Sequence, residues 1–159
     1  MNIVNIYRIS DNSNREKIKP TYASKENCLV TFIREFGSDN LIVLCDNVTD
    51  ATHEMVKKYA EADKIYVTRN GNTGSFIVSW DLAHRLIKEY GEDTIFYFIE
   101  DDYIHRRGAK RILLEAFQQL DASYVSLYDH PDKYQNFKIE RFTWDHGKQD
   151  EDINGIRVP

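Results

Sequence analysis

Two patterns of hydrophobic residues alternate along the chain. In the first, short runs of β-branched and aromatic residues are bounded by polar residues, which is typical of buried β-strands. In the second, hydrophobic residues recur every three to four positions, which is typical of a helix with one face against a core. The runs predict strands over Ile3–Ile9, Leu41–Cys45, Lys64–Thr68, Thr94–Ile99 and Tyr124–Tyr128. Lys138–Trp144 has a weaker pattern and could form one more strand.

A helix is predicted between each pair of successive strands. Ser24 can cap the first helix, which Gly37 ends, and Thr49 or Asp50 can cap the second. The third, from about Ser75 to Tyr90, is expected to bury Phe76, Trp80, Ala83 and Ile87. The fourth carries its apolar residues between Ile112 and Leu120. Strands that alternate with helices predict an α/β fold, with a mostly parallel sheet and helices on both faces. No repeat or linker interrupts the pattern, so we expect residues 1–159 to form a single domain.

Composition and charge exclude several classes of protein. The chain has 159 residues, 42% of them hydrophobic, and a net charge of −5 that argues against nucleic-acid binding. The longest apolar run, Ile95–Ile99, has five residues, against the ~20 that a membrane span needs. The first residues lack the basic start of a signal peptide. Cys28 and Cys45 stand in apolar surroundings, far from any C-x-x-C spacing. We therefore expect reduced, buried thiols and a cytoplasmic protein.

Polar residues follow the predicted strands, at the edge of the sheet where ligands of such folds bind. They are Ser10-Asp11-Asn12, Asp46-Asn47, Arg69-Asn70 and Glu100-Asp101-Asp102. The last group is the sharpest feature, because three adjacent carboxylates repel one another when all are ionised. A hard cation such as Mg²⁺ or Mn²⁺ would relieve that repulsion through oxygen ligands. The alternative is an acidic turn, solvated or paired with Arg106 and Arg107.

Other polar groups at this edge have two interpretations each. The loop Arg69–Gly74 could meet an anion through its backbone N–H groups, or could simply be a turn between strand and helix. Asp46 could accept hydrogen bonds from a ligand, or could cap the helix that begins near Thr49. His105, His130 and His146 each follow an acidic residue closely. Any of them could complete a metal or phosphate site, although a role at the surface is favoured.

The order of these features resembles a known family. Asp46-Asn47-Val48-Thr49-Asp50-Ala51-Thr52 follows an early strand, and Ile65–Gly74 and Phe98–Tyr103 come later, with helices between them. This order is similar to that of the nucleotide-diphospho-sugar transferase fold of GT-A glycosyltransferases, most closely their family 2-like members. The resemblance covers about residues 1–128, and it implies a Rossmann-like nucleotide-sugar-binding half followed by a short acceptor-side segment, 129–159.

The resemblance also implies roles for individual residues. Asp46 would contact the nucleotide base, and Asp102 would hold Mn²⁺ or Mg²⁺ on the diphosphate. Glu100 and Asp101 would face the ribose and uridine side. We expect Ser10, Arg69 and Gly74 to contribute to the same donor site.

The implied activity is that of a metal-dependent glycosyltransferase of the hexosyltransferase type. It would transfer a sugar from a nucleotide-sugar donor, a UDP-sugar, to a hydroxyl of a glycan or other acceptor. Asp129 or Asp145 would act as the base if the reaction inverts configuration, and His146 would add a metal ligand. Only 57 residues follow Asp102. That short remainder supports the alternative, a non-catalytic nucleotide-sugar-binding domain or remnant of the same fold.

Overall fold

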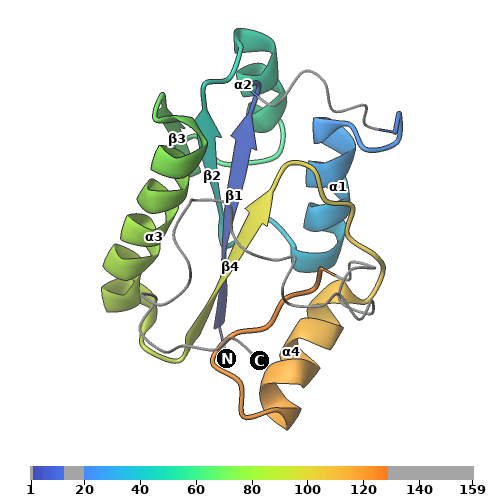
Figure 1. Cartoon of the computed structure of the whole chain (residues 1–159), viewed down its shortest axis with the longest axis vertical. Coiled ribbons are helices and arrows are strands. Elements are labelled where there is room, and N and C mark those ends of the chain that lie inside the picture. Colours follow the sequence, from blue (N-terminus) through green and yellow to red (C-terminus); the bar gives the residue numbers. More distant parts are fainter. Residues whose placement is uncertain (1, 13–19, 129–159) are drawn as a thin grey trace, which may run out of the picture. The chain divides into compact units, whose positions relative to one another are not determined.

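A computed structural model describes residues 2–12 and 20–128 of the chain. Within these residues, four strands form one parallel sheet with the order β3-β2-β1-β4 (Figure 1). The strands are β1 (Asn2–Ser10), β2 (Leu41–Asp46), β3 (Ile65–Thr68) and β4 (Thr94–Glu100). The α-helices are α1 (Lys25–Phe36), α2 (Asp50–Lys57), α3 (Gly71–Tyr90) and α4 (Ala109–Gln119), and a 3-10 turn spans Ala62–Lys64. The predicted α/β fold is confirmed.

The alternation of side chains along β1 places helices on both faces of the sheet. Val4 and Ile6 pack with Leu82 and Ala83 of α3. Tyr7, the residue after Ile6, points to the opposite face, where its ring lies against Phe32 of α1, with the ring centroids 5.6 Å apart. Every residue of β2 is buried and most of β1 is, as expected for central strands covered on both sides.

The predicted helix ends are largely confirmed. The backbone N–H of Asn27 donates to Ser24 Oγ (3.2 Å) at the start of α1, and that of Thr52 donates to Thr49 Oγ1 (3.4 Å) at the start of α2. Gly37 ends α1 with a φ of 82°, in the left-handed region that glycine adopts readily. Both cysteines are buried, as expected.

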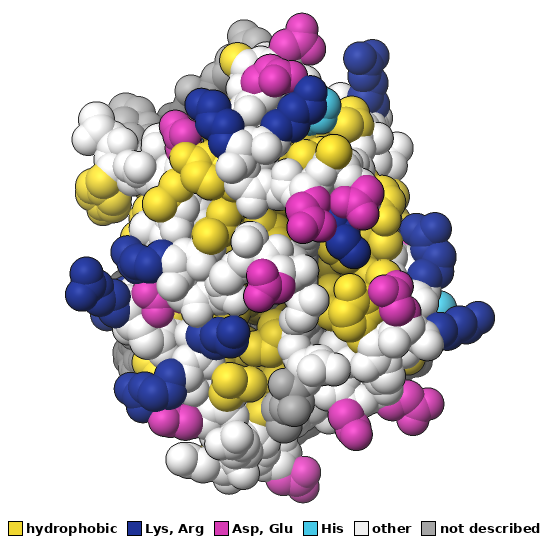
Figure 2. Space-filling model, turned by 180° about the vertical axis from the view of Figure 1, so that it is seen from behind, with side chains coloured by type: hydrophobic (Ala, Val, Ile, Leu, Met, Phe, Trp, Pro, Cys, Tyr) yellow, Lys and Arg dark blue, Asp and Glu magenta, His cyan; other side chains and the backbone are white. Residues whose placement is uncertain are grey.

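Two predictions about α3 are wrong. The helix begins at Gly71, so most of the expected loop over residues 69–74 belongs to its first turn. The face turned to the sheet carries Ser75, Ser79, Leu82 and Ala83, whereas Phe76 and Trp80 are 47% and 54% exposed. Small side chains let the helix backbone approach the sheet closely, which displaces the large ones to its flank. Trp80 stacks there on Phe98 of β4, at 5.0 Å between centroids. Figure 2 shows hydrophobic side chains at several other surface positions, separated by charged ones.

The described residues divide into two compact units, and the boundary falls within α4, between Glu115 and Ala116. The sheet and the candidate site belong to the first unit. In the second, residues 120–128 form no regular element, so the predicted strand Tyr124–Tyr128 is wrong. The weaker strand Lys138–Trp144 lies outside the described residues, and the single-domain assignment stays a prediction. Among the helices that the structure describes, none has the length and hydrophobicity to cross a membrane.

Candidate functional site

The carboxyl ends of the parallel strands bring together the polar residues that were expected to form a site. The first two members of the acidic triplet lie on opposite sides of the sheet. Glu100 points to the α3 face and Asp101 to the α1 face, as their partners show. The Glu100 and Asp101 carboxylates therefore do not converge on one point. No group of three or more His, Cys, Asp or Glu side chains arranged for a metal exists within residues 2–12 and 20–128.

Glu100 forms an ion pair with Arg8, which lies beside it in the neighbouring strand β1. The guanidinium group of Arg8 also donates to the backbone oxygen of Asn72 (2.9 Å) and to Ser75 Oγ (3.3 Å), both in the first turn of α3. Its Cζ lies 5.5 Å from the centre of the Phe76 ring, within the range of a cation–π contact. Arg8 thus links the end of β4 to the start of α3. Sequence reasoning did not single it out.

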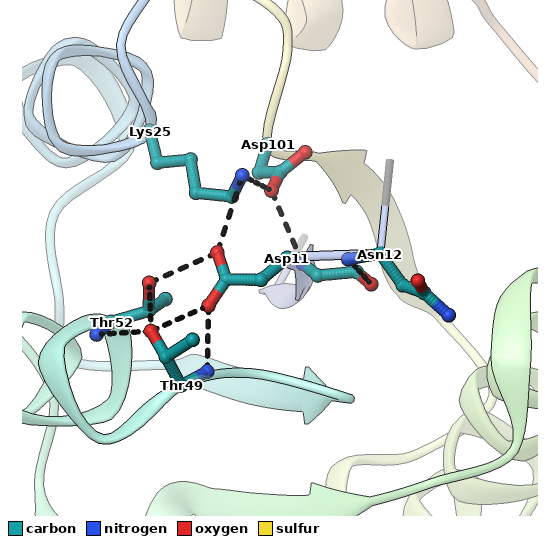
Figure 3. A network of polar contacts seen from close by, with 7 residues as sticks. Asp11, Asn12, Lys25, Thr49, Thr52 and Asp101 are labelled. Carbon is teal, nitrogen blue, oxygen red and sulfur yellow. Dashed lines mark hydrogen bonds and ion pairs between the residues drawn. The ribbon is translucent and has the colours of Figure 1, made fainter. Parts of the chain in front are cut away.

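Asp101 takes part in a second polar network, on the α1 side of the sheet (Figure 3). Its Oδ2 accepts the backbone N–H of Ser10 (3.1 Å) and lies 3.7 Å from Nζ of Lys25. The same ammonium lies 3.4 Å from Oδ1 of Asp11. Lys25 is the first residue of α1, so the network joins that helix to the ends of β1 and β4. Ser10 and Asp101, both predicted site residues, are in direct contact.

Asp11 fixes the start of α2. Its Oδ2 accepts the backbone N–H of Thr49 (2.6 Å) and the Thr49 hydroxyl (2.9 Å), and its Oδ1 accepts the Thr52 hydroxyl (3.0 Å). Burial alone would raise the pKa of Asp11, but these hydrogen bonds and the charge of Lys25 outweigh it, and the pKa lies below its usual value. Asp11 stood among the polar strand ends in the sequence, although no role was assigned to it.

Asp46 is enclosed at the end of β2, where it is 2% exposed. Its Oδ1 accepts the Thr68 hydroxyl (2.8 Å) and the backbone N–H of Asn70 (2.7 Å), while Oδ2 accepts the side-chain amide of Asn47 (2.9 Å). Asn47 has a φ of 50°, a left-handed conformation that Asn tolerates. The capping alternative for Asp46 is wrong, because Thr49 caps α2 itself. Asp46 instead joins β2 to the connection between β3 and α3.

The start of α3 contains the two glycines of the loop that could meet an anion or could simply be a turn. Gly71 has a φ of 71°, and Asn70 occupies the N-cap position with no hydrogen bond from its side chain to the helix. A Cβ atom on Gly74 would lie 2.7 Å from Cβ of Asn70, so this position needs glycine for packing. Arg69 is exposed. The packing requirement explains Gly74 without a ligand, and the donor-binding role of both residues stays a prediction.

Asp102 lies near a buried phenol. Tyr7 is fully buried, and no described residue accepts or donates a hydrogen bond at its hydroxyl. Burial raises the pKa of this hydroxyl far above its usual value, and the charges of Asp101 and Asp102 add to the effect. The phenol therefore stays protonated beneath the acidic residues. The predicted base candidates Asp129 and Asp145 and the predicted metal ligand His146 lie outside the described residues.

His105 is buried, so its expected surface role is wrong. Its Nε2 is 2.9 Å from the Tyr97 hydroxyl, and its ring meets Phe32 and Phe36 edge to face. Burial lowers the pKa of His105 below its usual value. The side chain is therefore a neutral anchor between β4 and α1.

Comparison with known proteins assigns the chain to a family. Residues 5–156 match glycosyl transferase family 2. No curated protein and no solved structure gives a match. The family match spans nearly the whole chain and agrees with the parallel sheet and with the polar strand ends described above. On this evidence the chain belongs to glycosyl transferase family 2.

Proposed function

We propose that this family 2 glycosyltransferase takes its sugar from a UDP-sugar, with Mn²⁺ or Mg²⁺ bound at Asp102, and passes it to a hydroxyl of a glycan or other acceptor. The observation that carries the proposal is the presence of acidic side chains at the carboxyl ends of β2 and β4, the parallel strands on either side of β1. Asp46 ends β2, and the triplet begins with Glu100, the last residue of β4. In open α/β sheets this edge is where nucleotides bind.

The described residues fit a metal only if the donor completes its coordination. Glu100 is paired with Arg8, and Asp101 is held by Lys25 and Ser10. Mg²⁺ is commonly held by one or two carboxylates together with substrate phosphates and water. Within the triplet we assign the cation to Asp102, the position that the resemblance to GT-A glycosyltransferases implies for the metal ligand. When bound, the cation would neutralise charge on the departing diphosphate.

Recognition of the base is proposed for the one remaining acceptor position of Asp46. A carboxylate offers about four acceptor positions, and the protein uses three of them here. Uracil presents an N–H group on its pairing edge where cytosine presents an acceptor. A fixed carboxylate therefore favours UDP over CDP.

Titration calorimetry of UDP with Mn²⁺, and with a chelator in its place, tests the donor site. We expect measurable UDP affinity only with the metal, and little metal binding without UDP. Asp102→Asn should lower the metal-dependent affinity by about tenfold or more. Asp39→Asn is the control, because Asp39 is exposed and precedes β2, at the opposite edge of the sheet. Equal UDP affinity with and without the metal would remove the metal from the proposal.

Turnover is tested separately with UDP-glucose and UDP-galactose, with and without a glycan mixture. Transfer that disappears in Asp129→Asn or Asp145→Asn would identify the base. Donor binding with no transfer and no hydrolysis would favour the alternative, a domain that binds the nucleotide sugar without catalysing its reaction.

A further inference from the structure

A short basic segment, residues 103–112, follows the acidic triplet directly. Its sequence is Tyr-Ile-His-Arg-Arg-Gly-Ala-Lys-Arg-Ile, so four of its ten residues are Lys or Arg and none is acidic. The whole chain carries a net charge of −5. The net negative charge of the whole chain would repel an anionic partner. A local concentration of positive charge therefore indicates a specific site for an anionic partner.

The cations of this segment are available to a partner. Arg106, Arg107 and Arg111 are exposed. Within the residues that the structure describes, the guanidinium groups of Arg106 and Arg107 have no ion-pair partner. Arg111 pairs with Glu115 on the surface (2.7 Å), an interaction that is worth little in water and is readily exchanged.

Hydrophobic side chains are exposed on either side of these cations in the sequence. Ile104 is 39% exposed and Ile112 49%, and Tyr103 is also exposed. An exposed set of Ile, Tyr and Arg residues is the composition of surfaces that lie at a membrane interface, where Tyr sits at the level of the headgroups. A nucleic-acid site would need a longer basic surface than four residues supply.

The segment is held rigidly. His105 is buried between the exposed residues, its backbone N–H donates to Thr31 Oγ1 (3.2 Å), and its oxygen accepts from Arg34 (2.8 Å). The backbone N–H of Gly108 donates to Glu35 Oε2 (2.6 Å). These contacts fix the backbone on both sides of Arg106 and Arg107, so little ordering entropy would be lost on binding.

We propose that residues 103–112 dock the protein on the surface of an anionic lipid bilayer. The cations would contact the headgroups, while Ile104 and Ile112 enter the boundary with the acyl chains. This surface is independent of the proposed donor chemistry, and its binding is measured without turnover.

Co-sedimentation of the full chain with vesicles tests the proposal. We expect binding to phosphatidylcholine vesicles that contain about a third phosphatidylglycerol, and little binding to phosphatidylcholine alone. Arg106→Gln with Arg107→Gln should weaken binding by about fivefold for each cation removed. Lys58→Gln with Lys88→Gln removes the same charge from exposed positions on other elements and should change binding by less than about twofold.

Ile104→Ser tests the hydrophobic part at constant charge. We expect it to weaken vesicle binding several-fold, whereas an acidic protein partner bound by charge alone would not require Ile104. Melting temperatures of all variants confirm that each is folded. The proposal is overturned if the chain binds both kinds of vesicle equally weakly, if the control pair loses as much binding as the Arg106 and Arg107 pair, or if Ile104→Ser binds as the parent does.

Discussion

Replacing Asp46 by Ala should destabilise the protein strongly. The substitution removes one carboxylate that accepts three hydrogen bonds in a site that is 2% exposed. A hydrogen bond to a charged group contributes about 1.5–3 kcal/mol, and the contributions of bonds that share one acceptor are not additive. We expect a loss of about 3–5 kcal/mol in the free energy of unfolding, because the N–H of Asn70 and the Thr68 hydroxyl would lose their acceptor at a partly buried site.

Urea unfolding followed by far-UV circular dichroism measures this loss. For a domain of this size the same change corresponds to a fall of roughly 10 °C in melting temperature. Asp39→Ala is the matched control, because that side chain is exposed, and its effect should stay within about 0.5 kcal/mol. A loss below about 1 kcal/mol for Asp46→Ala would refute the argument that this carboxylate joins β2 to the start of α3.

Asp46→Asn separates the structural role from recognition of the base. The amide keeps an oxygen for Thr68 and Asn70, so we expect a cost of only about 1–2 kcal/mol. Its NH₂ group can donate to cytosine, which a carboxylate cannot do. The preference for UDP over CDP should therefore narrow by about 1–3 kcal/mol, or roughly fivefold to a hundredfold in relative affinity. An unchanged preference in calorimetry would leave Asp46 with its structural role alone.

Three further predictions concern groups that support the site. Arg8→Ala should lower the free energy of unfolding by about 1–2 kcal/mol, mainly because the buried Ser75 hydroxyl and the Asn72 oxygen lose their donor. The Glu100 side chain is half exposed, so Glu100→Gln should cost less, and urea unfolding compares the two variants. Because the pKa of Asp11 is lowered in the folded chain, the ionised Asp11 side chain should stabilise the fold fully above about pH 4, and this stabilisation should be lost as the pH falls further. Unfolding measured from about pH 6 to about pH 2 should show a weaker dependence on acid in Asp11→Asn. Because the pKa of His105 is lowered in the folded chain, the unfolded chain binds a proton at this residue more readily. The free energy of unfolding should therefore fall as the pH drops below about 6.5, and its dependence on pH should be weaker in His105→Gln.

The strands were predictable because the sheet is covered on both faces. A strand that is buried on both sides must be hydrophobic along its length, and that continuity is visible in one sequence. The predicted Leu41–Cys45 differs from the observed β2 by one residue at its end, and Thr94–Ile99 differs from β4 in the same way. In both cases the missed residue is the carboxylate, Asp46 or Glu100, which ends the strand.

The local pattern of hydrophobic residues did not predict where α3 begins or which of its faces is buried. Gly and Asn are weak helix formers, so residues 69–74 read as a loop. Distant residues override this preference, because Asp46 accepts the N–H of Asn70 and Arg8 donates to Asn72 and Ser75. The prediction also placed Phe76 and Trp80 on the buried face because they are large and hydrophobic. Ala83 is buried as predicted, but Ser75, Ser79 and Leu82 are buried in place of the two aromatic residues.

The cations that pair with the acidic triplet could not be identified from the sequence, because the folding of the chain brings them together from distant positions. Arg8 stands in a strand that is otherwise largely apolar, and nothing in its neighbourhood along the chain indicates that it lies opposite Glu100. Lys25 is similarly distant in sequence from Asp101. The sequence suggested Arg106 and Arg107 as partners for the triplet instead, because they are close along the chain. The structure shows Arg8 and Lys25 in contact with the carboxylates.

These two cations change what the acidic triplet can do. Three adjacent carboxylates would repel one another, and the sequence therefore indicated a metal ion as the source of balancing charge. In the folded chain Arg8 pairs with Glu100, while Lys25 lies between Asp101 and Asp11, so these three carboxylates have cationic neighbours within the protein. Residues 2–12 and 20–128 hold no group of three His, Cys, Asp or Glu side chains arranged for a metal, so a divalent ion at Asp102 would need further oxygen ligands. The diphosphate of a donor supplies such oxygens, and this is why we expect metal and nucleotide to bind together and each to bind weakly alone.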